Sequence, residues 1–149
     1  MSDVTGANDV NDLLGAAGAE LNSRCDAIEQ CYEFMLAYAA QGLASDQGSS
    51  SGGQIREYLR KCDQALTELA GFLTGFVTHL QVESMAPYAG FLAVIERDAR
   101  DSQAAVRLVL AQPGISSQLV DNLNASIHLR ALLTDLFLID EVLKTHRRN

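Results

Sequence analysis

The chain has 149 residues, of which 48% are hydrophobic and 20% are charged, and its 11 Lys and Arg against 19 Asp and Glu give a formal net charge of -8. A chain of this length usually forms one domain, so we expect a single soluble domain over residues 1–149, with a core that needs no metal or disulfide. The acidic balance argues against nucleic acid as a partner, and apolar runs far shorter than the ~20 residues that cross a bilayer argue against a membrane-spanning helix.

The first predicted helix covers residues 8–43 and follows residues 1–7, which we expect to be disordered. Apolar residues recur in it at steps of three and four, the spacing that lines one face of an α-helix. Residues 1–43 hold seven acidic side chains and one arginine, whereas residues 84–149 carry equal numbers of each sign. We therefore expect the polar side of this helix to bind a basic surface on a protein partner. Its acidic side chains are Asp12, Asp26, Glu29 and Glu33.

Residues 44–53 are rich in Gly and Ser and are predicted to form a flexible loop. The apolar spacing then predicts a second helix over residues 53–83. Gly71 and Gly75 lie inside this helix, where each glycine costs roughly 1 kcal/mol relative to alanine. Close approach of a neighbouring backbone would offset that cost, and space for a ligand beside Phe72 is the less common alternative.

Pro87 and Pro113 lie where one apolar pattern ends and another begins, which is typical of helix boundaries. They indicate a third helix over residues 85–112 and a fourth over residues 116–146. No segment alternates apolar and polar residues as a strand does. The predicted class is therefore all-α, and four long helices with mostly short connections favour an antiparallel, up-down-up-down four-helix bundle.

The stretch from residue 127 to residue 143 is apolar around most of its circumference, so it needs neighbours on more than one side. One bundle core covers a single face of a helix. We therefore expect part of this stretch to be exposed and to form a homodimer interface. The side chains expected in that interface are Leu132, Leu136, Ile139 and Leu143.

Motifs for metal, haem or nucleophilic chemistry are missing from the sequence. None of His79, His128 and His146 follows a Glu at the spacing that di-iron bundles use, and no Cys-x-x-Cys-His or Gly-x-Ser-x-Gly motif occurs. The Gly-rich stretch also lacks the strand and the glycine–lysine spacing of a nucleotide-binding loop. We therefore expect no cofactor, no metal and no enzymatic activity.

His128, Asp135 and His146 share one direction of the fourth helix to within about 20° on a wheel of about 100° per residue. His128 and His146 are roughly 27 Å apart along the helix, too far to share a ligand, so each ionisable group needs a partner from another helix or from a second subunit. Arg24, near the apolar face of the first helix, is the expected partner for Asp135. A buried ion pair or an interfacial hydrogen bond is favoured over a ligand site. An enzyme using Asp135 and His128 as an acid/base pair ranks last.

The three cysteines are interpreted as small buried side chains. Cys25 and Cys31 lie about 120° apart around a helix and cannot pair, while Cys25 and Cys62 fall on the apolar faces of two different helices. A redox or metal role is left open for Cys31, the more peripheral of the three. Residues 1–5 do not resemble a signal peptide and three thiols cannot all pair, so we expect a cytoplasmic location.

These observations favour a non-enzymatic protein interaction module, such as an adaptor, an assembly factor or a regulator. The absence of catalytic motifs, the acidic first helix and the apolar fourth helix support this interpretation. The alternative is a bundle that binds a small molecule, metal or cofactor between its helices. Its polar contacts would come from Arg24, Tyr32, Cys62, His79, His128 and Asp135.

Overall fold

The computed structural model describes the backbone of residues 2–147 and the side chains of residues 15–145. All the regular secondary structure in this range is α-helix, so the all-α prediction is confirmed for the described residues. Six helices follow one another, not the four expected. They are α1 (Ser2–Ala40), α2 (Ser50–Leu66), α3 (Leu69–His79), α4 (Ala86–Leu110), α5 (Ser117–Ala125) and α6 (His128–Arg147).

Two of the four expected helices are interrupted, which is why six are present. The segment 53–83 is divided at Glu68 and the segment 116–146 is divided at Ile127. These residues have φ values of 57° and 62°, a left-handed conformation that an α-helix of L-residues cannot contain without a break. The prediction of four continuous helices is therefore wrong. The breaks were missed because neither carries the proline or glycine that usually marks one.

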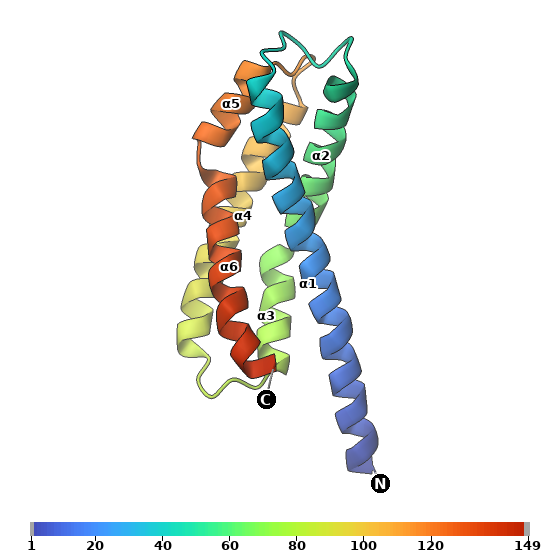
Figure 1. Ribbon diagram of the computed structural model, residues 1–149. Helices are drawn as coiled ribbons and strands as arrows, with labels where there is room; N and C mark the ends of the chain where they lie inside the picture. Colours follow the sequence, from blue (N-terminus) through green and yellow to red (C-terminus); the bar gives the residue numbers. More distant parts are fainter. Residues whose placement is uncertain (1, 148–149) are drawn as a thin grey trace.

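The helices lie side by side along one axis (Figure 1). Following α1, the chain returns through α2 and α3, runs back along α4, and returns again through α5 and α6. α1 packs against α2, α3, α5 and α6, and α4 packs against α2, α3, α5 and α6. α1 begins at Ser2, so the helix also covers residues 2–7, for which disorder was predicted. Among the described residues no helix combines the length and the apolar character needed to traverse a bilayer.

The core contains the side chains that were expected to form a dimer interface. Leu132, Leu136, Ile139 and Leu143 are at most 3% exposed and lie in the same apolar cluster as Ile28, Leu59 and Ile95. The prediction that they are exposed is therefore wrong. The physical reason is that α6 packs against α1, α4 and α5 together, so three neighbours cover a wider apolar sector than one bundle face requires.

One buried carboxylate connects the loop between α1 and α2, part of the segment 44–53 that was predicted to be flexible, to two other parts of the chain. Asp46 accepts hydrogen bonds from Arg56 Nε at 2.6 Å and from the backbone N–H of Ile115 at 2.7 Å. The other guanidinium nitrogens of Arg56 donate to the carbonyl oxygens of Leu110 and Gln112. The loop thus joins the start of α2 to the end of α4, and residues from Ser50 onwards belong to α2.

A second set of hydrogen bonds joins the end of α1 to the start of α5. The hydroxyl of Tyr38, which is fully buried, donates to the carbonyl oxygen of Ile115 at 2.6 Å. Ser117 donates through its hydroxyl to the carbonyl oxygen of Tyr38, and it accepts from the backbone N–H of Leu43. Together with Asp46, these groups connect the end of α1, the loop that follows it and the start of α5. They lie at the end of the bundle where α2 and α5 begin (Figure 1).

Candidate functional site

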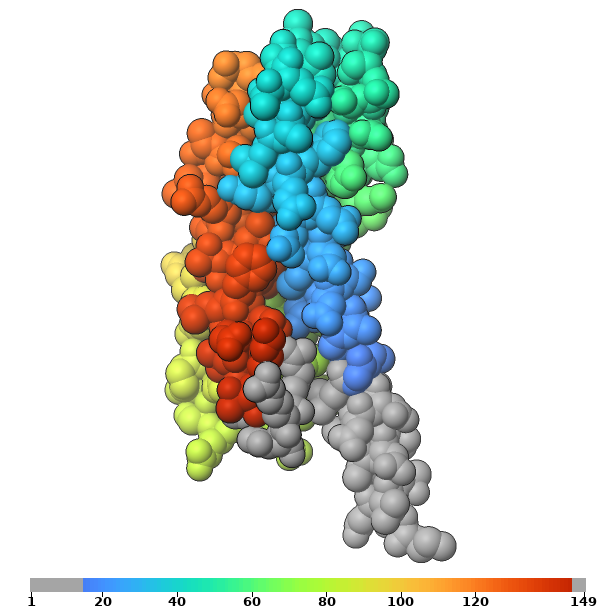
Figure 2. All heavy atoms as spheres, viewed as in Figure 1, coloured from blue at the N-terminus to red at the C-terminus, as the bar shows by residue number. Residues whose placement is uncertain are grey.

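The outer face of α6 carries an apolar stripe that the core does not use. Phe137, Leu138 and Val142 are 52%, 55% and 41% exposed, and they lie beside the buried Leu136, Ile139 and Leu143 in the same helix. In Figure 2 the surface of α6 runs between that of α1 and the part of α4 near its start. We call Phe137, Leu138 and Val142 the α6 stripe. Large apolar side chains grouped in this way are typical of a binding surface.

A shallow apolar groove borders the α6 stripe on the side of α4. Its volume is about 300 Å³. Three residues of each helix line it: Pro87, Tyr88 and Phe91 from α4, and Leu138, Ile139 and Val142 from α6. We call this the α4–α6 groove. Because Leu138 and Val142 belong to both, the groove and the stripe form one continuous apolar surface.

A pair of carboxyl groups, Asp98 and Asp135, lies on the same two helices beyond the residues that line the α4–α6 groove. Asp135 precedes Leu138 by one helical turn, and Asp98 follows Phe91 by two turns, so each lies in line with the groove on its own helix. Oδ2 of Asp135 is buried and receives no hydrogen bond from the described groups. Burial, and then the neighbouring Asp98 carboxyl, raise the pKa of Asp135 to about 7. When one proton binds, the two carboxyls can share it in a hydrogen bond; when none binds, they repel each other.

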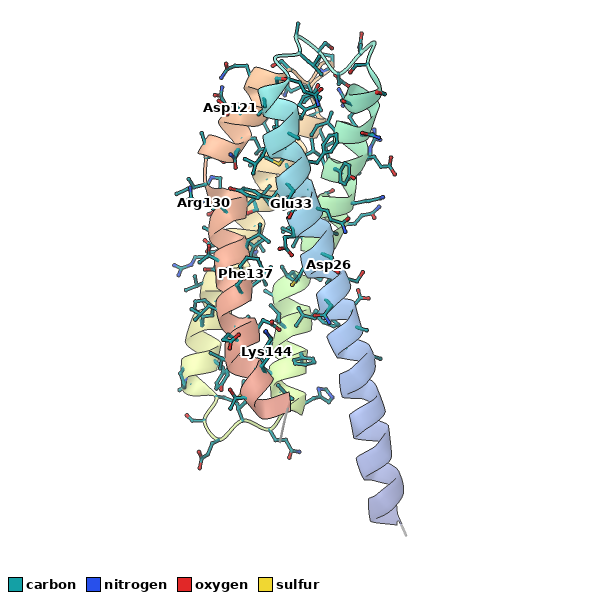
Figure 3. The ribbon with its side chains drawn as sticks, viewed as in Figure 1. Asp26, Glu33, Asp121, Arg130, Phe137 and Lys144 are labelled. Atoms are coloured by element: carbon teal, nitrogen blue, oxygen red, sulfur yellow. The ribbon has the colours of Figure 1, made fainter. Side chains whose placement is uncertain are left out.

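Acidic residues border the α6 stripe on the side of α1. A hollow of about 150 Å³ lies there, and Cys25, Asp26, Glu29, Phe137 and Asp140 are among its lining residues. Burial, followed by the charges of Asp140, Asp26 and Glu29, raises the pKa of the Cys25 thiol to about 11. Figure 3 labels the side chains on this face: Asp26 and Glu33 from α1, Asp121 from α5, and Arg130, Phe137 and Lys144 from α6.

The acidic residues predicted to bind a partner are only partly brought to this surface. Asp26 and Glu33 are exposed and Glu29 is half-buried, and all three lie on α1. The side chain of Asp12 lies outside the described residues, as does that of His146. The acidic side of α1 therefore reaches the α6 stripe through Asp26 and Glu29, which share the hollow with Phe137.

Arg24 does not pair with Asp135, so that expectation is wrong. Its Nε contacts Glu20 at 3.1 Å, and its Nη1 donates to the carbonyl oxygens of Ala65 and Thr67 at 3.0 and 2.7 Å. The last carbonyl groups of a helix have no donor within the helix, and the guanidinium supplies one where α2 ends. Asp135 instead faces Asp98, which the sequence analysis did not single out.

The remaining candidate residues are dispersed. His79 is exposed near the end of α3, where its Nδ1 lies 2.7 Å from the carbonyl oxygen of Gly75, and His128 is half-buried at the start of α6. Cys31 and Cys62 are fully buried and interact with each other, whereas Cys25 is half-buried. The prediction that Cys31 is the most peripheral thiol is thus wrong. Within the described residues, no cluster of three or more His, Cys, Asp or Glu side chains fits a metal ion.

A larger cleft lies at the break between α2 and α3. Its volume is about 570 Å³, and its lining includes Arg24, Phe72, Arg100 and Gln103. The Arg24 guanidinium lies over the Phe72 ring, 5.4 Å from its centre. A Cβ atom built on Gly71 would meet nothing within 4 Å. The expected close approach of a neighbouring backbone to this glycine is therefore wrong, and open space lies beside it.

No protein-family model, curated protein or solved structure matches the chain. Asp98, Phe91 and the α6 stripe were not predicted from the sequence. Their signal was present in the seven-residue spacings from Phe91 to Asp98 and from Asp135 to Val142, which place each pair on one helical face.

Proposed function

We propose that this protein is a non-enzymatic interaction module that binds a protein partner through the α6 stripe and the adjoining α4–α6 groove. The observation that carries the proposal is the exposure of Phe137, Leu138 and Val142 beside a groove lined by apolar side chains. Exposing such side chains to water is unfavourable, roughly 25 cal/mol per Å² of apolar surface, and a partner that covers them recovers this free energy. An adaptor, an assembly factor or a regulator would use the surface in this way.

The proposal includes the architecture and the location expected from the sequence. We propose an up-down-up-down bundle of four helical segments, in which α2 and α3 form one segment broken at Glu68 and α5 and α6 form another broken at Ile127. The course of the chain in Figure 1 supports this. We also propose a cytoplasmic location. The contact between the free thiols Cys31 and Cys62 in the core supports a reducing compartment.

The test compares variants that differ only in which exposed leucine becomes charged. Leu138→Glu places a carboxylate in the groove, whereas Leu108→Glu alters a leucine on α4 that is 66% exposed and outside the groove. The tagged full chain is incubated with extract of the source organism, and bound proteins are identified by mass spectrometry. We expect a protein retained by the wild type and by Leu108→Glu to be lost from Leu138→Glu. Equal retention by all three would contradict the proposal.

Self-association through the same surface is the dimer form of this proposal. Sedimentation velocity of the full chain at micromolar concentration distinguishes it from a module that binds another protein. A dimer that Leu138→Glu converts to monomer, while circular dichroism stays unchanged, would identify a second copy as the partner. A monomer at all concentrations would leave the surface to a different protein.

A second candidate function is the binding of a small molecule in the cleft at the α2–α3 break. The open space beside Gly71 favours it, together with the polar side chains of Arg24, Arg100 and Gln103. A thermal-shift screen of small metabolites would compare the wild type with Gly71→Leu, which fills the cleft. A compound that raises the Tm of the wild type alone would support this function, since ligands stabilise the state that binds them. An equal response of both chains would contradict it.

A further inference from the structure

We propose that the occupant of the α4–α6 groove is an amphipathic helix of a partner protein, with apolar side chains in the groove and a Lys or Arg beside Asp98 and Asp135. This inference rests on the proposed function and specifies the chemistry of the partner. The groove explains the apolar part of the occupant, and the carboxyl pair at its end explains the basic part.

The dimensions of the surface fit a helix. Asp135 and Val142 are seven residues apart on α6, or about 10 Å at the helical rise, and Phe91 and Asp98 are seven residues apart on α4. α4 and α6 run in opposite directions, so the two apolar ends meet and the two carboxyls meet (Figure 1). An occupant therefore contacts apolar side chains over about one turn of α6, from Leu138 to Val142, and meets Asp135 about one turn beyond them.

The carboxyl pair has no cation of its own in the described structure. Arg130 lines the same hollow as Asp135 but forms no ion pair with it within the described residues, and Lys144, at the other end of the groove, contacts Asp140 and Glu141. A buried carboxylate oxygen without a donor is unfavourable, and the repulsion from a second carboxyl adds to the cost. A Lys or Arg from outside would supply donors and remove that repulsion.

Asp135 is reachable from the surface. It lines a second hollow of about 480 Å³, together with Ile127, Arg130, Ala131 and Thr134. The charged groups around it come from several helices: Asp98 from α4 faces it, Arg130 of α6 shares its hollow, and Asp26 and Glu29 of α1 border the other side of α6. Within the described residues, no charged side chain of α5 lines either hollow. The arriving cation therefore meets a region in which carboxyls predominate.

The same charges argue against a second copy of this chain as the occupant. A two-fold dimer brings identical surfaces together, so Asp98 and Asp135 would face the acidic border of the same surface on the other copy. The chain as a whole carries a formal charge of -8, which adds repulsion at low ionic strength. A partner of opposite charge on the rim of the groove avoids both costs.

The affinity of a basic occupant should depend on pH. Burial and Asp98 raise the pKa of Asp135 to about 7, so below that pH the pair keeps a proton and carries one negative charge. Above it both carboxyls are ionised, and the attraction for a cation increases. Binding should therefore strengthen between pH 6 and pH 8. If a histidine cation of the partner carried the attraction, binding would instead weaken over this range.

The experiment uses a fluorescein-labelled, Ala-rich helical peptide of about 18 residues with Leu on one face and Arg at both ends, so that either orientation brings an Arg to the pair. A control peptide carries Gln in place of Arg. Fluorescence anisotropy with the full chain at pH 8 and low salt should give about tenfold tighter binding for the Arg peptide, as expected for one charged hydrogen bond. Asp135→Asn should remove most of this preference, and Leu138→Glu should weaken both peptides.

Each outcome separates the partner chemistry from the proposed function. Equal binding of both peptides, with loss in Leu138→Glu, would overturn the basic partner while supporting the docking surface. Binding of the Arg peptide that Asp135→Asn leaves unchanged would place the cation elsewhere and would also overturn it. If neither peptide binds, or if the chain dimerises through the stripe, the amphipathic helix is not the occupant. Asp101→Asn, which alters an exposed aspartate of α4 outside the groove, is the matched control.

Discussion

Asp46→Ala tests whether one carboxylate holds the α1–α2 loop. The substitution removes the acceptor for Arg56 Nε at 2.6 Å and for the Ile115 N–H at 2.7 Å, in a side chain that is 8% exposed. Breaking a buried ion pair costs about 3–5 kcal/mol. Arg56 keeps its bonds to the carbonyl groups of Leu110 and Gln112, so we expect Asp46→Ala to lower the free energy of unfolding by about 2–4 kcal/mol. Urea denaturation followed by circular dichroism measures this change.

The pH dependence of the same variant provides a second measurement. The hydrogen bond from Arg56 is the main cause that lowers the pKa of Asp46 in the folded chain. A carboxyl with a lowered pKa stabilises the fold above its unfolded pKa, about 4, and this contribution is lost as the pH falls through the folded value. Asp46→Ala should therefore lose part of the acid sensitivity of the wild type. Gln47→Ala, in the same loop, should change stability by less than about 0.5 kcal/mol. An Asp46→Ala variant as stable as Gln47→Ala would refute the reasoning.

Three further measurements examine other parts of the molecule. At pH 8 Cys25 should react with Ellman's reagent about a hundredfold more slowly than a free thiol, since its pKa is raised to about 11, and Cys31 should react only after unfolding. Asp135→Asn should be more stable than the wild type by about 1–2 kcal/mol at pH 8 in urea denaturation, allowing for solvent screening, and similar to it near pH 5, because a raised carboxyl pKa lowers stability as the pH rises from about 4 to about 7. Gly52→Ala should unfold at clearly lower urea, because its Cβ would lie 1.7 Å from the backbone oxygen of Asp46.

The helical class followed from local spacing, but the two breaks did not. Apolar residues continue at steps of three and four across Glu68, so the pattern predicts one helix over 53–83. In the folded chain the break at Glu68 is accompanied by long-range bonds: Arg24 of α1 and Gln103 of α4 both donate to groups of the α2 terminus, including Thr67. Such contacts join residues about 36 to 43 positions apart, and a periodicity argument includes none of them.

Composition alone does not reveal the contacts that the loop at 44–53 makes in the folded chain. Gly and Ser side chains add little packing, and on that basis the 44–53 segment was predicted to be flexible. The one acidic residue in it, Asp46, lies 69 positions from Ile115 in sequence and bonds to its backbone N–H. Leaving this buried carboxylate or its donors unpaired would be costly, so its hydrogen bonds favour the observed conformation of the loop.

The sequence predicted that α6 exposes some apolar side chains, but it pointed to the wrong residues. Around a helix that is apolar on most sides, Leu132 and Leu138 are equivalent in sequence, and only the neighbours decide which is buried. Leu132 is fully buried, while Leu138 remains 55% exposed. The same arrangement places Asp135 opposite Asp98, where a helix wheel of α6 alone gives no partner. The candidate surface is therefore formed by two helices together. Its apolar and acidic parts adjoin because the packing of α4 against α6 brings Phe91 and Leu138 to one groove and Asp98 next to Asp135.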